Sequence, residues 1–191
     1  TPGQERSTLE TPVLMVNLDL FEANIRSMAD HCRNNGKAWR PHSKAHKSPA
    51  IARFLLDNGA SGITCAKLGE AELMAQHGIE SILLANQIVT PSKHKTLAEL
   101  QRQTEIIAAI DHISVVEPMG KAATKEQTII PVVVEIDIGM DRVGVEPGLP
   151  TLDLAKAICA QPGLAFKGIM GYEGHVLDLS PPTDKERACN Q

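Results

Sequence analysis

Apolar and polar positions along the chain fall into two alternating patterns. Short apolar or β-branched runs predict strands, and the amphipathic segments between them predict helices. The predicted strands are Ala38–Arg40, Gly62–Cys65, Ser81–Ala85, Ile106–Ile110, Val132–Ile138 and Ala165–Met170. The predicted helices are Leu20–Asn34, Pro49–Asn58, Leu68–Gln76, Pro91–Gln103, Ile113–Ala123 and Thr151–Ala160, and a further apolar run, Pro12–Leu18, precedes the first of them.

This strand–helix repeat predicts an α/β fold with a parallel sheet and right-handed crossovers. Successive strands are spaced by roughly 20–35 residues, as in the βα units of a barrel. A doubly wound open sheet is the competing architecture, but it usually carries a GxGxxG turn after its first strand. The glycines of residues 139–144 do not match that turn. We therefore predict a (β/α)8 TIM-type barrel, truncated here to about six of the eight units.

Composition supports one globular domain over residues 1–191, with 42% apolar and 22% charged residues. The net charge of −4 favours neither nucleic acid nor an anionic membrane as a partner. No apolar stretch approaches the roughly 20 residues of a membrane span, and no secretory signal opens the chain. The four cysteines are far apart and never form a CxxC pair, so we expect reduced thiols and a cytoplasmic location.

The most polar segment of the chain is RPHSKAHK, residues 40–47. If the preceding strand continues through it, one side of that strand presents Arg40, His42, Lys44 and His46. One interpretation is a basic surface loop that binds anions. The other is a lysine nucleophile, because neighbouring positive charges disfavour a protonated amine and free it to form a Schiff base. Lys47 competes with Lys44 for this role, although its odd position directs it to the other face.

Two further polar segments follow later strands. In VVVEIDIGMDRVGV, residues 132–145, Glu135 and Asp137 share the parity opposite to the buried positions, and Arg142 lies in a glycine-flanked turn. The two carboxylates indicate either a site or ordinary ion pairs, and the guanidinium suits a phenolate or carboxylate. In GIMGYEGH, residues 168–175, the only tyrosine, Tyr172, lies between two glycines; it is either structural or a ligand contact.

The remaining histidines carry less information. His42 and His46 are four residues apart, but they are not the helical HExxH pair of a zinc protease, so a site of that kind is rejected. Four others are interpreted as ordinary surface residues: His31, His77, His94 and His112.

The chain resembles the metal-activated D-threonine aldolase and D-serine dehydratase family, whose barrel is shared with alanine racemase. The resemblance rests on RPHSKAHK, GITCAKLGEAE, LLANQIV, VEIDIGMDRVGV and GIMGYEGH, in that order, and covers residues 11 to about 175. It implies a fold type III enzyme that uses pyridoxal 5'-phosphate to cleave β-hydroxy-D-amino acids to glycine and an aldehyde. Elimination of water from D-serine is the alternative within the family.

The resemblance also implies roles for individual residues. Lys44 would bind the cofactor covalently and move the Cα proton, with His42 in support. Arg142 would hydrogen-bond the cofactor's 3-oxygen, and Tyr172 would lie near the pyridine ring as the partner of its nitrogen. Glu135 stands where alanine racemases carry a lysine, which argues against simple racemase activity.

Other properties of the family concern parts that this chain does not contain. The family's divalent metal is bound by a C-terminal β domain, and the phosphate is held by loops after the last two strands, so no metal ligand is expected in this chain. The implied partner is a small D-amino acid, and the resemblance allows for a homodimer of the full-length protein. Two rival classes remain: a non-catalytic pyridoxal-phosphate carrier, and a binding protein with a basic loop and no cofactor.

An incomplete barrel leaves both edges of its sheet unpaired, and unpaired edges promote association. Expressed as these 191 residues, the chain is expected to self-associate and to have negligible aldolase activity. Size-exclusion chromatography and assay of glycine release from D-threonine check this. A monodisperse monomer, or measurable glycine release, would contradict it.

Overall fold

A computed structural model describes residues 5–190. These residues form two compact units, divided between Trp39 and Arg40. The N-terminal unit contains a short 3-10 helix, η1 (Arg6–Thr8), and the long helix α1 (Leu18–Asn34). Asn17 caps α1, because its side-chain oxygen accepts the Leu20 N–H at 3.1 Å.

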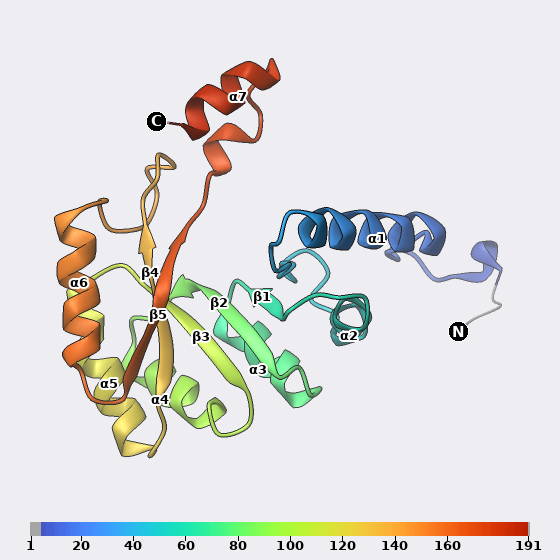
Figure 1. The fold of residues 1–191 in the computed structure, drawn as a ribbon. Helices are drawn as coiled ribbons and strands as arrows, with labels where there is room; N and C mark the ends of the chain where they lie inside the picture. The colour runs from blue at the N-terminus through green and yellow to red at the C-terminus, as the bar shows by residue number, and fades with distance from the viewer. Residues whose placement is uncertain (1–4, 191) are drawn as a thin grey trace. The chain divides into compact units, whose positions relative to one another are not determined.

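The second unit is built on a five-stranded, fully parallel sheet, shown in Figure 1. The strands lie side by side in chain order. They are β1 (Ile63–Cys65), β2 (Ser81–Gln87), β3 (Glu105–Ile110), β4 (Ile130–Ile136) and β5 (Leu164–Gly171). A doubly wound sheet would reverse its strand order at a switch point, whereas a barrel adds each strand beside the previous one. The sequential order therefore confirms the barrel-type α/β fold.

Helices connect successive strands and cover one face of the sheet, as Figure 1 shows. The helices of this unit are α2 (Pro49–Asp57), α3 (Leu68–Gln76), α4 (Pro91–Leu100), α5 (Val116–Lys125), α6 (Leu149–Ala160) and α7 (Pro182–Cys189), with the 3-10 turns η2 (Ile113–Val115) and η3 (Gly174–Val176). Alternate strand residues are fully buried under these helices: Ile82, Leu84, Ile106, Ala108, Ile130, Val132 and Val134. Burial of this apolar layer is the main contribution to the stability of the sheet.

The strand predicted over Ala38–Arg40 is wrong. Among the described residues, pairing beside β1 is limited to an isolated parallel bridge between His42 and Thr64. The Thr64 N–H donates to the Pro41 oxygen and the Ser43 N–H donates to the Thr64 oxygen, each at 2.8 Å. Pro41 has no N–H to extend this ladder, and the chain turns immediately after Ser43. The described residues therefore contain five strands, not six, and the bridge at His42 stands in place of the predicted first strand.

One predicted surface histidine is buried. His94 on α4 is 1% exposed, and one ring nitrogen lies 2.7 Å from the Ile88 oxygen while the other has no partner. His94 is buried together with its apolar neighbours on α4. The periodicity of the sequence did not reveal this, because His94 is a polar residue.

No helix within residues 5–190 combines the length and the apolar character needed to cross a membrane. All four cysteines lie in the described part and none forms a disulfide.

Candidate active site

A cavity of about 670 Å³ lies at the carboxyl ends of the parallel strands. Parallel strands place these ends at a single edge of the sheet, which in barrels is the edge that carries active sites. The lining residues come from every strand of the sheet except β3: Arg40, His42, Lys44, Thr64, Ala66, Leu83, Ala85, Asn86, Gln87, Glu135, Arg142, Val143, Met170, Gly171 and Tyr172. The three polar segments recognised in the sequence therefore meet at one cavity.

A tight turn separates the two lysines that competed in the sequence. The Ser43 oxygen accepts the N–H groups of His46 at 3.1 Å and Lys47 at 2.8 Å, and Lys47 has a left-handed φ of 49°. Lys44 lines the cavity, whereas the Lys47 amine forms an ion pair with Glu70 at 3.3 Å outside it. The turn, and not strand parity, directs Lys44 into the cavity.

His42 lies beside Lys44 in the cavity wall. Its Nδ1 accepts the backbone N–H of Lys44 at 3.2 Å, which holds the ring against the turn. Burial lowers the pKa of His42, and the charge of Lys44 lowers it further, so the imidazole is neutral at pH 7.

His46, predicted to share the face of His42, does not line the cavity. Its Nδ1 accepts the Ser48 N–H at 3.0 Å, at the start of α2. The difference arises because the chain has left the extended conformation by residue 44, so the two-residue alternation no longer applies.

Arg40 lines the cavity but its guanidinium is already hydrogen-bonded. It donates to the backbone oxygen and to the hydroxyl of Ser81, at 3.2 and 3.1 Å. A side chain at Gly62 would place its Cβ 2.0 Å from the Arg40 guanidinium, so glycine is required there for this close approach. Arg40 therefore joins the segment before β1 to the start of β2 and stabilises the cavity wall.

A loop over residues 137–145 carries Arg142 to the cavity. The end of the loop pairs with the end of β4. The Val145 N–H donates to the backbone oxygen of Glu135 at 2.9 Å, and the Asp137 N–H donates to the backbone oxygen of Val145 at 3.0 Å. The Asp111 carboxylate, beyond the end of β3, accepts the Gly144 N–H at 3.2 Å. The loop that carries Arg142 is therefore fixed by hydrogen bonds to the end of β4 and to Asp111.

Asp137 was predicted to face the cavity with Glu135, and the structure corrects this. Strand β4 ends at Ile136, and the Asp137 carboxylate accepts the N–H groups of Gly139 at 3.0 Å and Asp141 at 3.1 Å. These backbone hydrogen bonds lower the pKa of Asp137. Asp137 therefore holds the turn that leads to Arg142 and does not enter the cavity.

Arg142 and Tyr172 meet at the mouth of the cavity. The guanidinium carbon of Arg142 lies 5.5 Å from the centroid of the Tyr172 ring, within the range of a cation–π contact. The ring packs against Gly174, where an added Cβ would lie 2.4 Å from it. Gly174 therefore makes room for the tyrosine ring.

Glu135 is a buried carboxylate in the cavity wall, 5% exposed. Its side chain accepts a hydrogen bond from the Gln87 amide, which reaches across β3 from the end of β2. The register of β2 against β3 shifts between Leu84 and Gln87, and such irregularities redirect side chains at strand ends. Burial raises the pKa of Glu135, with the Gln87 hydrogen bond and the nearby Arg142 charge acting in the opposite direction.

Gln87 and Asp111 belong to this site but were not predicted from the sequence. Both follow apolar runs that were correctly predicted as strands, so their position at a strand end was the available signal. Neither is part of a cluster of charges, and the contact of Gln87 with Glu135 spans 48 residues.

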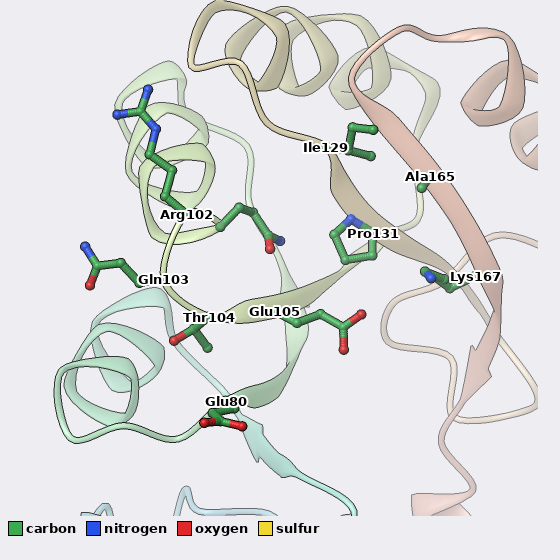
Figure 2. Close-up of a pocket in the computed structure, with 10 residues that line it drawn as sticks. Glu80, Arg102, Gln103, Thr104, Glu105, Ile129, Pro131, Ala165 and Lys167 are labelled. Carbon is green, nitrogen blue, oxygen red and sulfur yellow. The ribbon is translucent and has the colours of Figure 1, made fainter.

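A second hollow, of about 500 Å³, lies at the opposite, amino-terminal ends of the strands. Figure 2 shows Glu105 on one side of it and Ala165 and Lys167 on the other, with Pro131 between them. It contains none of the predicted site residues. In barrels this end contributes to stability rather than to chemistry, so the candidate site is the cavity at the carboxyl ends.

The chain matches the family model described as alanine racemase, N-terminal domain, over residues 16–191. It is 35% identical to the 3-hydroxy-D-aspartate aldolase of Paracoccus denitrificans (strain Pd 1222), over 97% of this chain and 48% of that protein. It is also 35% identical to the D-threonine aldolase of an Arthrobacter species, over 100% of this chain and 50% of that protein. The crystal structure of D-threonine aldolase from Filomicrobium marinum superposes with a TM-score of 0.92 at 36% identity, covering 95% of this chain and 49% of that one. The chain thus spans about half the length of the relatives that it matches.

The raised pKa of Glu135 predicts a pH-dependent gain in stability for Glu135→Gln. The folded state binds the proton of Glu135 more tightly than the unfolded state does. The contribution of Glu135 to the free energy of unfolding is therefore most favourable in acid. It is lost as the pH rises from the usual pKa of glutamate through the pKa in the folded state. The free energy of unfolding of Glu135→Gln should therefore increase relative to the unchanged protein between pH 4 and pH 7. Urea unfolding of both proteins across this range measures the difference, and a constant or shrinking difference would contradict the assignment.

Gly144 should tolerate alanine less well than Gly148, although both have positive φ angles, 106° and 93°. An added Cβ at Gly144 would lie 2.4 Å from the Asp137 nitrogen, whereas at Gly148 it would meet open space. Gly148→Ala should cost about 1 kcal/mol from backbone strain alone, and Gly144→Ala at least about 2 kcal/mol. Urea unfolding gives both values; equal costs would mean that the 137–145 loop is not packed as described.

Proposed function

We propose, because the chain belongs to the alanine racemase N-terminal domain family, that the cavity at the carboxyl ends of its strands holds pyridoxal 5'-phosphate. One observation supports this proposal above the others. Three segments, residues 40–47, 132–145 and 168–175, bring the Lys44 amine, the Arg142 guanidinium and the Tyr172 phenol to one cavity. A basic surface loop that binds no cofactor would require neither the Arg142 guanidinium nor the Tyr172 phenol at this cavity.

The cavity fits such a group in size and in chemistry. Its volume of about 670 Å³ lies within the roughly 300–1,000 Å³ of small-molecule sites. A primary amine is the group that binds an aldehyde covalently, and Lys44 is the only lysine among the residues that line the cavity. A guanidinium complements an anionic oxygen, and a phenol offers both a donor and an aromatic edge.

Each lining residue then has a defined task. Lys44 holds the cofactor through its amine and afterwards carries a proton to and from the Cα of the substrate. His42 accepts the Lys44 backbone N–H and, being neutral, adds no further positive charge beside that amine. Arg142 would donate to the anionic ring oxygen of the cofactor, and Tyr172 would contact its ring. When bound, pyridoxal phosphate supplies an electron sink for the charge left at Cα.

The reaction proposed for the whole protein is cleavage of the Cα–Cβ bond of a β-hydroxy-D-amino acid. The hydroxyl proton leaves, the β-carbon becomes an aldehyde, and Cα takes up a proton to give glycine, so that atoms balance without an oxidant. The substrate class follows from the names of the relatives, a D-threonine aldolase and a 3-hydroxy-D-aspartate aldolase. Elimination of water, as in a D-serine dehydratase, would instead yield a 2-oxo acid and ammonia.

Further properties of the whole protein are part of the same proposal. We assign residues 1–191 to the cofactor-binding barrel and the protein to the cytoplasm, where its four free cysteines would remain reduced. The residues described here contain no group of three His, Cys, Asp or Glu side chains arranged to hold a metal ion. The proposal therefore assigns no ligand of a divalent metal to this part of the protein.

Lys44→Ala in the complete protein should abolish the visible absorbance of lysine-bound pyridoxal phosphate and lower aldolase activity at least about a thousandfold. The physical reason is that no other lysine lines the cavity. Lys93→Ala, which removes an exposed lysine from a neighbouring hollow, is the matched control and should keep both properties. Spectroscopy and product analysis measure these outcomes.

The proposal fails if Lys44→Ala retains the absorbance and the activity. Formation of a 2-oxo acid and ammonia in place of glycine and an aldehyde would leave the cofactor site intact and assign the protein to the dehydratases.

A further inference from the structure

Glu70 on α3 is a buried carboxylate that none of the steps above uses. It is 9% exposed, and polar groups around it compensate for its burial. One oxygen accepts the Ala66 N–H at 2.9 Å, and the other lies 3.3 Å from the Lys47 amine. Burial alone would raise the pKa of Glu70, but the Ala66 N–H, the Lys47 amine and a backbone hydrogen bond from Lys67 together outweigh burial and hold the pKa below its usual value. The carboxylate is therefore ionised at neutral pH and available to the lysine.

Lys47 lies close to the cofactor cavity without entering it. Its side chain, 54% exposed, borders a separate hollow of about 640 Å³. The two hollows share a wall made of Ala66, Asn86 and Gln87. The two hollows are therefore adjacent. Of the lysines that border the second hollow, Lys47 is nearest in sequence to Lys44, so it is the amine that competes most directly with Lys44 for an aldehyde that enters from solvent.

We propose that Glu70 is a positioning residue that directs the aldehyde to Lys44 by holding Lys47 in an ion pair. This inference rests on the proposed function, because it concerns which lysine carries pyridoxal phosphate. The carboxylate is itself anchored by the Ala66 N–H, so it cannot follow Lys47 into another arrangement without losing that hydrogen bond. The left-handed backbone at Lys47 and its N–H bond to the Ser43 oxygen further limit where the side chain can reach.

The ion pair with Glu70 protects Lys47 against condensation with the aldehyde. In the condensation, the amine nitrogen attacks the aldehyde carbon, a carbon–nitrogen double bond forms, and the aldehyde oxygen leaves as water with two hydrogens of the amine. At Lys47 this reaction would draw the nitrogen away from Glu70. It would leave one oxygen of a buried carboxylate without its partner, which costs far more than breaking an exposed pair. Among the described residues, Lys44 forms no ion pair with a carboxylate, so its amine is free to react.

The test maps the site of covalent labelling instead of measuring activity. The intact protein is incubated with pyridoxal phosphate and treated with borohydride, which adds hydride to the carbon of the double bond while the nitrogen takes a proton from water. Peptide mass spectrometry then measures the label at each lysine. The unchanged protein should carry at least tenfold more label on Lys44 than on Lys47.

Glu70→Gln should raise the share of label on Lys47 at least fivefold, because glutamine keeps an oxygen for the Ala66 N–H but cannot form the ion pair. Glu72→Gln, on the same helix and without an ion pair among the described residues, is the matched control and should leave the ratio unchanged. Circular dichroism shows whether Glu70→Gln remains folded.

Lys44→Ala provides a second comparison that does not depend on the folding of Glu70→Gln. With Glu70 intact, Lys47 should stay essentially unlabelled in Lys44→Ala, and it should accept the label only in the double variant with Glu70→Gln. Labelling of Lys47 in Lys44→Ala at the level that Lys44 reaches in the unchanged protein would overturn the inference, as would an unchanged ratio in folded Glu70→Gln. Absence of label on Lys44 in the unchanged protein would instead count against the proposed function.

Discussion

The parallel pairing of five strands in chain order is the constraint on which the rest of the structure depends. It places every strand's carboxyl end at one edge, so segments that lie far apart in the sequence deliver their polar residues to the same cavity. The apolar layer beneath the helices keeps this sheet in place, because its residues alternate with those that face the cavity. Pairing and burial therefore position Lys44 relative to Arg142 and Tyr172 although none of these side chains bonds to another strand.

Fine positioning of the site comes from backbone hydrogen bonds in the segments just beyond the strands. The Ser43 oxygen closes the turn that separates Lys44 from Lys47, and the Asp137 carboxylate closes the turn that leads to Arg142. Asp111 attaches the second of these loops to the end of β3. Loops held in this way present functional side chains without strands of their own, and the two acidic residues contribute to the site without entering it.

Most of the fold could be predicted from the sequence, because apolar periodicity reports burial directly. The helix over residues 68–76 agrees at both ends, and five strands appear where apolar runs predicted them. The failures have a common origin in longer-range contacts. Pro41 and the turn after Ser43 prevent a sixth strand, and packing places His94 inside although its residue type indicated the surface. The roles of Lys44, His42, Arg142 and Tyr172 remain predictions, supported by their meeting at one cavity.

By itself, the sequence determined the class of fold, the location of the chemistry at strand ends and the residue types available there, because periodicity and local turn signals are encoded in neighbouring residues. Only the tertiary structure shows that Lys44 lines the cavity and that Lys47, three positions later and already the less favoured candidate, does not. The physical reason is that Glu70, the partner of Lys47, lies on α3, 23 positions later in the chain, and its carboxylate is held there by the Ala66 N–H. The same reason applies to the contact of Gln87 with Glu135 across β3, since a hydrogen bond between residues 48 positions apart leaves no local pattern.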